Sequence, residues 1–288
     1  MIDKSETPLV SISCIIYNHV HYIKDALDSF LMQKTDFSFE ICLGEDESDD
    51  GTREICQEYA EKHPEKIRLF LRSRKDVLYI DGQATGSYNA SETLKKCKGK
   101  YIALCEGDDY WIDPYKLQKQ VDFLETNKEY VLTGGRGDTL EEDLGTLTES
   151  TYPNVNMEIT RDYLFTWNPF HTASIFFRNI NINFPLFFNK YFAGDWMLYF
   201  LMTEHGKLYF SKEKYQIYRN HKGGITKSSK RHTQEIGYMK MLVEINEYFE
   251  SKYNDILWKV NNAYSKRIYD ENCKALNEAE KVFIQKWL

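Results

Sequence analysis

Short apolar runs alternate with amphipathic stretches along the first 125 residues of the chain. Four runs have the apolar, β-branched composition of buried strands: LVSISCII (9–16), FEICLG (39–44), IRLFLR (67–72) and KYIALCEG (100–107). Between and after them, apolar residues recur at helical spacing at 22–33, 52–62 and 87–98, and Asp113-Pro114 marks the start of a fourth helix. This alternation predicts an α/β fold with a mostly parallel sheet that helices cover on both faces.

The pattern is looser after residue 130. The stretch 131–150 is polar and contains glycines, which predicts a loop or hairpin over the sheet edge. Further strands are expected at 173–178 and 215–219, with a helix from Asp195 to about Glu204. These elements would complete the sheet that the first part of the chain begins.

From about residue 231 the chain is long, aromatic and helical in pattern. We therefore expect one domain over residues 1–228, with halves at about 8–125 and 126–228, and a helical C-terminal extension over 229–288. Acidic, basic and aromatic residues are mixed in this extension. Three roles stay open for it: a cap on the domain, a homodimer contact, or an amphipathic surface that docks on a membrane.

Polar residues follow three of the predicted strands. Tyr17-Asn18-His19 comes after the first strand, the acidic stretch CLGEDESDDGT (42–52) ends the second, and Glu106-Gly107-Asp108-Asp109 ends the fourth. In parallel α/β sheets, ligands bind beyond the carboxyl ends of the strands. The two acidic turns are therefore expected to face the same crevice, although they lie about 60 residues apart.

The stretch CLGEDESDDGT has three readings. An EF-hand calcium loop that starts at Asp46 fits at Ser48, Asp50 and Gly51, but its twelfth position is Gln57, which has no carboxylate. A strand also precedes the stretch, where an EF-hand has a helix. A solvated turn that caps the next helix fits well, and Asp50 is assigned to that capping. The third reading, a binding site for a polar ligand, depends on the rest of the chain.

Composition and charge narrow the choice of partners. The chain has 288 residues and a net charge of −7, and it has no long basic run, so nucleic acid is excluded as a partner. Its six cysteines form no CxxC pair, which is typical of buried thiols in a reducing compartment. The start shows no signal-peptide pattern, and no apolar run reaches membrane-spanning length. These features predict a cytoplasmic protein, with docking at the inner face of the membrane left open.

Three segments together resemble the family 2 glycosyltransferases, which have a GT-A fold: VSISCIIYNHVHYIKDALDSFLMQ, FEICLGEDESDDGTREICQEYA and CKGKYIALCEGDDYWIDPYKLQKQ. The likeness covers roughly residues 8–225, and the order and spacing of the three segments make it specific. It implies a nucleoside diphosphate sugar as donor, most often a UDP-sugar. It also implies a divalent cation, Mg²⁺ or Mn²⁺, which prefers carboxylate oxygens and substrate phosphates as ligands.

The resemblance assigns donor-side roles to individual residues. Asp46 would contact the nucleotide base, beside the Tyr17-Asn18 turn. Asp109 would ligate the metal directly, and Asp108 would touch the ribose or a metal-bound water. Relatives commonly have Asp where this chain has Glu106, so Glu106 keeps only part of that role or is a strand-end surface residue.

Two further residues belong to the chemistry of transfer. Asp195, in FAGDWMLYF, matches the position of the family's general base, which takes the proton of the acceptor hydroxyl. Gly194 stands where relatives have a second acidic residue, so Asp195 is the single local candidate. His221, in YRNHKGGITKSS, would ligate the metal from a loop that closes over the diphosphate. Helix capping by Asp195 and a surface position for His221 are the structural alternatives.

The sequence therefore predicts a metal-dependent, inverting glycosyltransferase that acts on a glycan or a lipid-linked acceptor in cell-surface polysaccharide synthesis. A nucleotidyltransferase is disfavoured because YNHVHY lacks a glycine-rich, basic phosphate loop. A non-catalytic nucleotide- or carbohydrate-binding module of the same fold stays open, because Gly194 and Glu106 depart from the family pattern.

Overall fold

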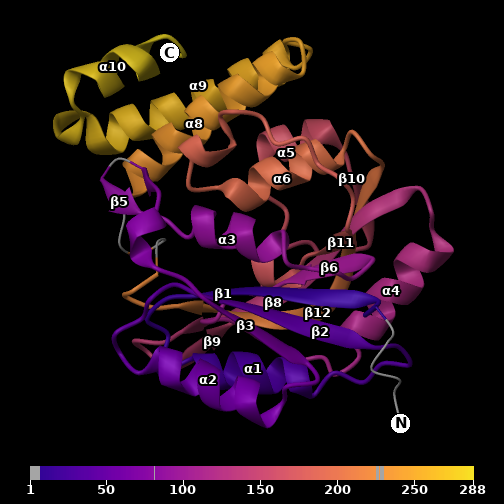
Figure 1. Ribbon diagram of the computed structural model, residues 1–288. Helices are drawn as coiled ribbons and strands as arrows, with labels where there is room; N and C mark the ends of the chain where they lie inside the picture. Colours follow the sequence, from indigo (N-terminus) through magenta and orange to yellow (C-terminus); the bar gives the residue numbers. More distant parts are fainter. Residues whose placement is uncertain (1–6, 81, 225–226, 228–229) are drawn as a thin grey trace.

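The computed structural model describes residues 7–80, 82–224, 227 and 230–288 (Figure 1). Its strands are β1 (Val10–Ile16), β2 (Phe39–Glu45), β3 (Ile67–Leu71), β4 (Tyr79–Ile80), β5 (Gln83–Ala84), β6 (Tyr101–Leu104), β7 (Tyr110–Trp111), β8 (Tyr130–Glu141), β9 (Thr146–Thr148), β10 (Met157–Ile159), β11 (Phe176–Arg178) and β12 (Lys207–Asn220). Ten of these strands form one sheet in the order β10-β12-β8-β11-β6-β1-β2-β3, with β7 paired to β12 and β9 to β8. The strands β4 and β5 form a separate hairpin.

The four strands predicted in the first half form the parallel part of the sheet. Strand β1 pairs with β2 from Val10 opposite Phe39, and with β6 from Val10 opposite Tyr101. Strand β3 extends the same parallel set beside β2. All seven residues of β2 are buried, and so are nearly all those of β1, which explains their unbroken apolar runs.

The predicted parallel arrangement is found in β3, β2, β1 and β6. The rest of the sheet contains both parallel and antiparallel pairs. Strand β11 is antiparallel to both β6 and β8, whereas β8 and β12 are parallel to each other.

The prediction of a loop or hairpin at the sheet edge over 131–150 is wrong in its first part, because β8 lies inside the sheet. Glycine has a low strand propensity, so the sequence pattern did not predict a strand here. Close packing nevertheless requires glycine at two of these positions. A Cβ atom on Gly134 would lie 2.5 Å from the Phe170 ring, and one on Gly137 would lie 2.1 Å from the Gln216 side chain.

The helices are α1 (Ile23–Leu31), α2 (Thr52–Lys62), α3 (Ser87–Leu94), α4 (Lys116–Thr126), α5 (Arg161–Thr166), α6 (Gly194–Met202), α8 (Arg231–Tyr248), α9 (Asn254–Asn272) and α10 (Glu278–Gln285). Figure 1 shows α1 and α2 on one face of the sheet and α3 and α6 on the other. The expected helix start at Asp113-Pro114 is two residues early. Asp113 accepts the Tyr115 N–H at 2.9 Å and so closes a turn just before the helix begins at Lys116.

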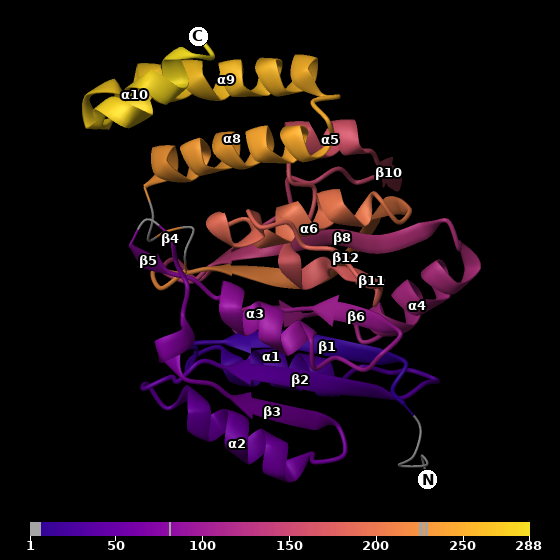
Figure 2. The ribbon, with the colours of Figure 1, turned by 45° about the horizontal axis from the view of Figure 1, so that its top comes forward.

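The C-terminal helices form a further layer beyond α5 and α6 (Figure 2). Buried apolar residues of α8, among them Met241, Leu242 and Ile245, belong to the same hydrophobic cluster as Trp196 and Phe200 of α6. The extension therefore packs on the second half of the domain, as a cap would. Among the described residues, no helix is both long and apolar enough to cross a membrane.

One ionisable side chain is enclosed in the core beside the parallel strands. Lys116 has no exposed surface, and its ammonium group donates to Gln120 Oε1 at 2.8 Å and lies 4.2 Å from the centre of the Trp111 ring. Burial lowers the pKa of Lys116 to about 7. Above neutral pH, Lys116 is therefore mostly deprotonated in the folded protein, whereas it stays protonated in the unfolded chain.

We predict that this lysine makes the protein more stable as the pH rises. Between pH 7 and 9 the unfolded state holds more protons, so the free energy of unfolding should increase by up to about 1.4 kcal/mol per pH unit from this residue. Urea unfolding of Lys116→Met should lack this increment. Lys119→Met is the control, because Lys119 is half exposed and its pKa is raised. Equal pH slopes for wild type and Lys116→Met would contradict the prediction.

Candidate functional site

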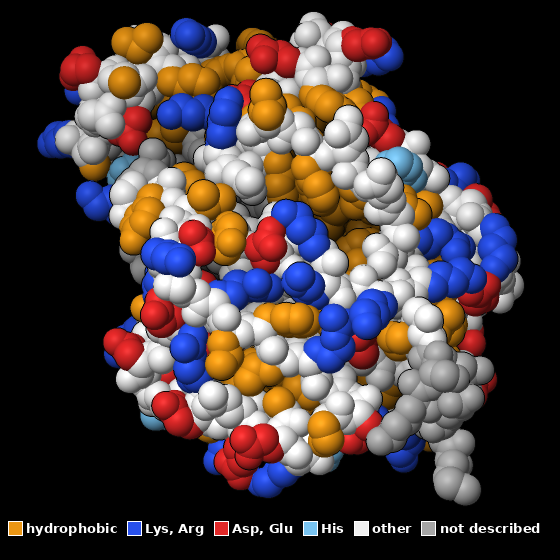
Figure 3. Space-filling view, viewed as in Figure 1, with side chains coloured by type: hydrophobic (Ala, Val, Ile, Leu, Met, Phe, Trp, Pro, Cys, Tyr) orange, Lys and Arg blue, Asp and Glu red, His pale blue; other side chains and the backbone are white. Residues whose placement is uncertain are grey.

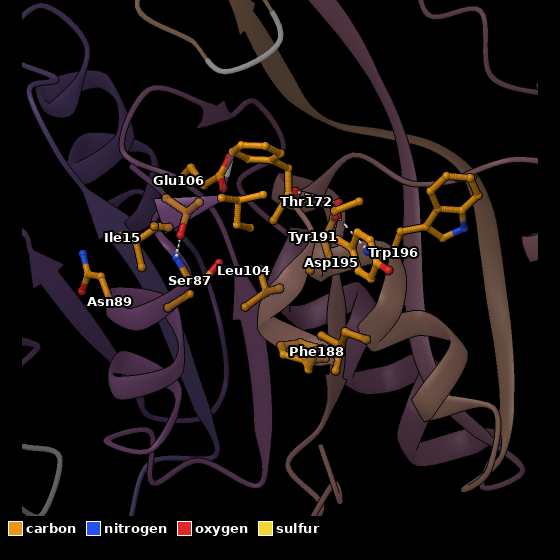
Figure 4. A pocket seen from close by; sticks show the side chains of 18 of the residues that line it. Ile15, Ser87, Asn89, Leu104, Glu106, Thr172, Phe188, Tyr191, Asp195 and Trp196 are labelled. Atoms are coloured by element: carbon orange, nitrogen blue, oxygen red, sulfur yellow. Dashed lines mark hydrogen bonds between the residues drawn. The ribbon is translucent and has the colours of Figure 1, made fainter. Parts of the chain in front are cut away.

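A cavity of about 1600 Å³ opens beyond the carboxyl ends of the parallel strands. Five carboxylates from distant parts of the chain line it: Asp46, Glu106, Asp108, Asp195 and Glu280. Figure 4 shows Glu106 on one side of the cavity, near Ile15 and Leu104, and Asp195 beside Thr172 on the other. The two acidic turns thus share one crevice, as the strand order required.

The acidic stretch after β2 is held in place by its own side chains. Asp50 accepts the Thr52 N–H at 3.0 Å at the start of α2, and its other oxygen accepts the Val20 N–H at 3.1 Å. The Asn18 amide donates to Asp49 Oδ1 at 3.0 Å, and Asn18 Oδ1 accepts the Asp49 N–H at 3.1 Å. Asp50 thus accepts the first N–H of α2, although Gly51 and not Asp50 occupies the N-cap position. Asn18 joins two loops and does not line the cavity.

Asp46 forms a polar group with Arg74 and Tyr17 on the wall of the cavity. One carboxylate oxygen pairs with Arg74 at 3.0 Å, and the Arg74 guanidinium lies over the Tyr17 ring at 3.7 Å from its centre. The other oxygen, Oδ1, is buried and has no hydrogen-bond partner among the described residues. Burial raises the pKa of Asp46, although Arg74 opposes that shift. An unpaired buried acceptor of this kind is suited to a ligand N–H group.

Sequence reasoning did not identify Arg74. It lies in η1 (Arg74–Asp76), just beyond the end of β3, so the rule of carboxyl strand ends that selected the other loops would also have selected this one.

Glu106, Asp108 and Asp109 form a tight acidic cluster after β6. One oxygen of each carboxylate lies within 4.8 Å of the others. Asp109 is buried, and its Oδ1 accepts the Arg219 N–H at 2.8 Å. Burial and the neighbouring carboxylates raise the pKa of Asp109 well above its usual value, and they raise that of Glu106 to about 8.

Asp108 is the member of the cluster that meets two histidines. Its Oδ2 lies 3.0 Å from His221 Nε2 and 3.7 Å from His19 Nε2. Burial alone would raise the pKa of Asp108, but the two histidines bring it below the usual value. Its Oδ1 is buried and has no partner among the described residues. Three carboxylates in reach of one another, one with a free buried oxygen, fit a hard divalent cation.

The residues predicted to bind the metal differ in their access to the cavity. Asp108 lines the cavity, whereas Asp109 and His221 lie behind it, the first against Arg219 and the second against Asp108. His19 joins them at the end of β1, in the loop that the rule of strand ends selects, but its contact with Asp108 spans 89 positions and could not be predicted from the local pattern.

Asp195 lies in the first turn of α6 and is held by neighbouring donors. Its Oδ1 accepts the Trp196 N–H at 2.7 Å, and its Oδ2 accepts from the Thr172 hydroxyl at 3.2 Å and the Tyr199 hydroxyl at 3.4 Å. Burial raises its pKa, and these hydrogen bonds, with one from Asn168, oppose the shift. The side chain is partly exposed and lines the cavity, and the N-cap position of α6 belongs to Ala193, so the carboxylate of Asp195 is within reach of a bound molecule.

The family model described as glycosyl transferase family 2 matches residues 11–184. An uncharacterised protein of Mycobacterium tuberculosis is 31% identical over 220 residues, which are 76% of this chain and 61% of that protein. The chain thus spans less than two thirds of the length of that relative. TuaG of Bacillus subtilis, whose name assigns it to teichuronic acid biosynthesis as a glycosyltransferase, is 34% identical over 117 residues, 41% of this chain and 42% of TuaG.

Solved structures show the same fold. The 1–349 fragment of S. aureus TarS, in complex with UDP-GlcNAc, matches with a TM-score of 0.64 and 18% identity over 91% of this chain and 73% of that one. The mannosyltransferase PcManGT of Pyrobaculum calidifontis, in complex with GDP-Man and Mn²⁺, matches with a TM-score of 0.54 and 15% identity over 98% of this chain and 85% of that one. The GT-A-like fold expected from the sequence is confirmed.

We predict that the donors around Asp195 keep its pKa from rising further. Tyr199→Phe or Thr172→Val removes a hydrogen bond to the carboxylate, so the pKa of Asp195 should rise and less of it should be ionised at a given pH. A carboxyl ¹³C NMR titration measures this pKa directly. Tyr209→Phe is the control, because the Tyr209 ring packs against Phe123. An unchanged Asp195 titration in both test variants would show that these contacts do not act on the carboxylate.

Proposed function

The chain belongs to glycosyltransferase family 2, and we propose that it moves a sugar from a nucleoside diphosphate to an acceptor hydroxyl with inversion at the anomeric carbon. One observation supports this above all. A single cavity joins the Asp46 subsite, the acidic cluster around Asp108 and the positioned carboxylate Asp195. A binding module has no need of a carboxylate such as Asp195. A transferase needs a nucleotide subsite, a metal site and a base.

The donor occupies the end of the cavity formed by β1, β2 and α3. The unpaired Asp46 oxygen accepts an N–H group of the base, and Tyr17 with Arg74 flanks it. A uracil base offers one such N–H beside carbonyl groups that the Arg74 guanidinium can meet, which favours a UDP-sugar.

The acidic cluster would hold a divalent cation, Mg²⁺ or Mn²⁺, through Asp108 and Asp109, with Glu106 and His221 adjoining. When bound, the cation supplies Lewis-acid neutralisation of the leaving diphosphate. The protein residues keep the cluster together: the Arg219 backbone N–H orients Asp109, and His221 with His19 supports the ionised form of Asp108.

Asp195 acts as the general base at the other side of the cavity. It takes the proton of the acceptor hydroxyl while the acceptor oxygen bonds to the anomeric carbon and the bond to the diphosphate oxygen breaks. Figure 4 shows Glu106 and Asp195 on different sides of the cavity, an arrangement that agrees with the inversion proposed here, in which the acceptor attacks the face of the sugar opposite the leaving diphosphate. An α-linked donor would give a β-linked product.

The name of TuaG supports a role in cell-surface polysaccharide synthesis, with a glycan or lipid-linked acceptor. We place the reaction in the cytoplasm or at the inner face of the membrane. The buried free thiols Cys14, Cys42 and Cys56 are consistent with a reducing compartment.

We predict metal-dependent binding of a nucleoside diphosphate. In calorimetric titrations, UDP should bind in the presence of Mn²⁺ and lose at least about tenfold in affinity in EDTA, in Asp108→Asn and in Asp109→Asn. Asp122→Asn is the control, since Asp122 is exposed on α4, accepts a hydrogen bond from Gln118 and does not line the cavity. GDP and ADP, titrated in parallel, identify the base. Failure of every nucleotide to bind to the folded wild type would remove the donor site from the proposal.

We predict that Asp195→Asn separates binding from turnover. The variant should bind UDP with Mn²⁺ as the wild type does, because Asp195 lies away from the donor subsite. Transfer, measured as UDP released from a UDP-sugar in the presence of acceptor, should fall about 10²–10⁴-fold. Unchanged turnover in this variant would exclude Asp195 as the base. Nucleotide binding without turnover in the wild type would favour the non-catalytic module instead.

A further inference from the structure

The segment at 182–188, INFPLFF, connects β11 to the catalytic helix α6 and exposes large apolar side chains. Leu186 is fully exposed, at 101% of its reference surface, and Phe184 is 44% exposed. The rings of Phe184 and Phe188 contact each other, with centroids 4.5 Å apart. Scattered exposed apolar residues are common on proteins, but a contiguous group at the edge of a cavity marks a contact site.

The apolar segment is continuous with the cavity that contains Asp195. Ile182, Phe184 and Phe188 line that cavity, together with Tyr191, only four residues before Asp195. Figure 4 shows Phe188 on the same side of the cavity as Tyr191 and Asp195. Apolar side chains thus line the cavity near Asp195, and the fully exposed Leu186 lies in the same segment, between Phe184 and Phe188. A purely polar acceptor, such as a free oligosaccharide, would leave these apolar side chains unused.

Cationic side chains also line the cavity. They are Lys95, directly after α3, Lys190, and Lys240 of α8, whereas α10 adds the acidic Glu280. Lys95 is paired with Glu92 and Lys190 with Glu244, so the net charge is moderate. Figure 3 shows a hollow with hydrophobic side chains, and lysine or arginine side chains lie beside it. Apolar and cationic groups side by side are complementary to an amphipathic anion.

We propose that the acceptor is a lipid-linked sugar, and that the 182–188 segment binds the part of its apolar chain nearest the sugar while the lysines meet an anionic linker such as a phosphate. This inference rests on the proposed function and specifies its acceptor. A second copy of the chain fits less well, because a stable protein interface takes about 20–30 residues a side and this segment has seven.

The test uses n-decyl phosphate, below its micelle concentration, as an amphipathic anion of known structure. Calorimetry with the full chain, in the presence of UDP and Mn²⁺, should show saturable binding of decyl phosphate. Binding should weaken about tenfold or more in a Phe184→Ser, Leu186→Ser double variant. Inorganic phosphate should bind far more weakly than decyl phosphate. Lys240→Gln should weaken decyl phosphate binding and reduce its salt dependence.

A matched control is available on the surface of the same protein. Leu144, at the turn between β8 and β9, is 74% exposed and outside the cavity, so Leu144→Ser should leave decyl phosphate binding unchanged. The double variant should still bind UDP with wild-type affinity, which shows that its donor site is folded. Absence of UDP binding in the wild type would count against the proposed function, whereas a wild type that binds UDP but not decyl phosphate would count against this inference.

Three results would overturn the proposal. The first is equal decyl phosphate affinity in the wild type and the double variant. The second is competition between decyl phosphate and UDP, which would place the probe in the donor subsite. The third is a double variant that binds decyl phosphate as the wild type does but differs in another property. A difference in sedimentation with phosphatidylglycerol vesicles would assign the segment to a membrane surface, and a difference in oligomeric state would assign it to a contact with a second copy of the chain.

Discussion

The parallel pairing of β1 with β2 and with β6 is the constraint on which the site depends. This register brings the ends of three strands to one edge of the sheet, so that Tyr17, Asp46 and Asp108 line one cavity although they are far apart in the chain. Helix α3 must also lie close to β2 for the cavity to form. Gly44 permits this approach, because a Cβ there would lie 2.1 Å from the Thr93 hydroxyl. Sheet register and close packing thus form the part of the cavity around Tyr17, Asp46 and Asp108.

Carboxylates gathered in this way repel one another, and the surroundings decide which stay ionised. His19 and His221 favour the anion at Asp108, whereas Asp109 and Glu106 are shifted toward the protonated form by burial and by each other. Such a cluster is poised for a cation, which would relieve the repulsion. Asp195, on the other side of the cavity, is separately supported by the hydroxyl groups of Thr172 and Tyr199. The two groups still interact across the cavity, because the charge of Asp195 contributes to the raised pKa of Glu106.

The second half of the chain determines what the first half can act on. Helix α6 carries the proposed base Asp195, the segment before it is apolar and exposed, and α8 and α10 contribute to the wall of the cavity. The C-terminal helices share the core of this half through Met241 and Leu242. The packing that holds these helices in place therefore also shapes the part of the cavity around Asp195.

The sequence by itself determined the elements and the chemistry of the first half. Local hydrophobic periodicity fixed β1, β2, β3 and β6, and the polar residues after them followed from the rule of strand ends. Only the tertiary structure decided the position of the glycine-rich strand β8, because its pairing with β11 and β12 is non-local and overrides weak strand propensity. It also decided that Asn18 braces a turn and that Arg74 and His19 join the site. The rule of strand ends selects the loops that carry these residues, but their partners come from other loops, and only the fold brings those side chains together.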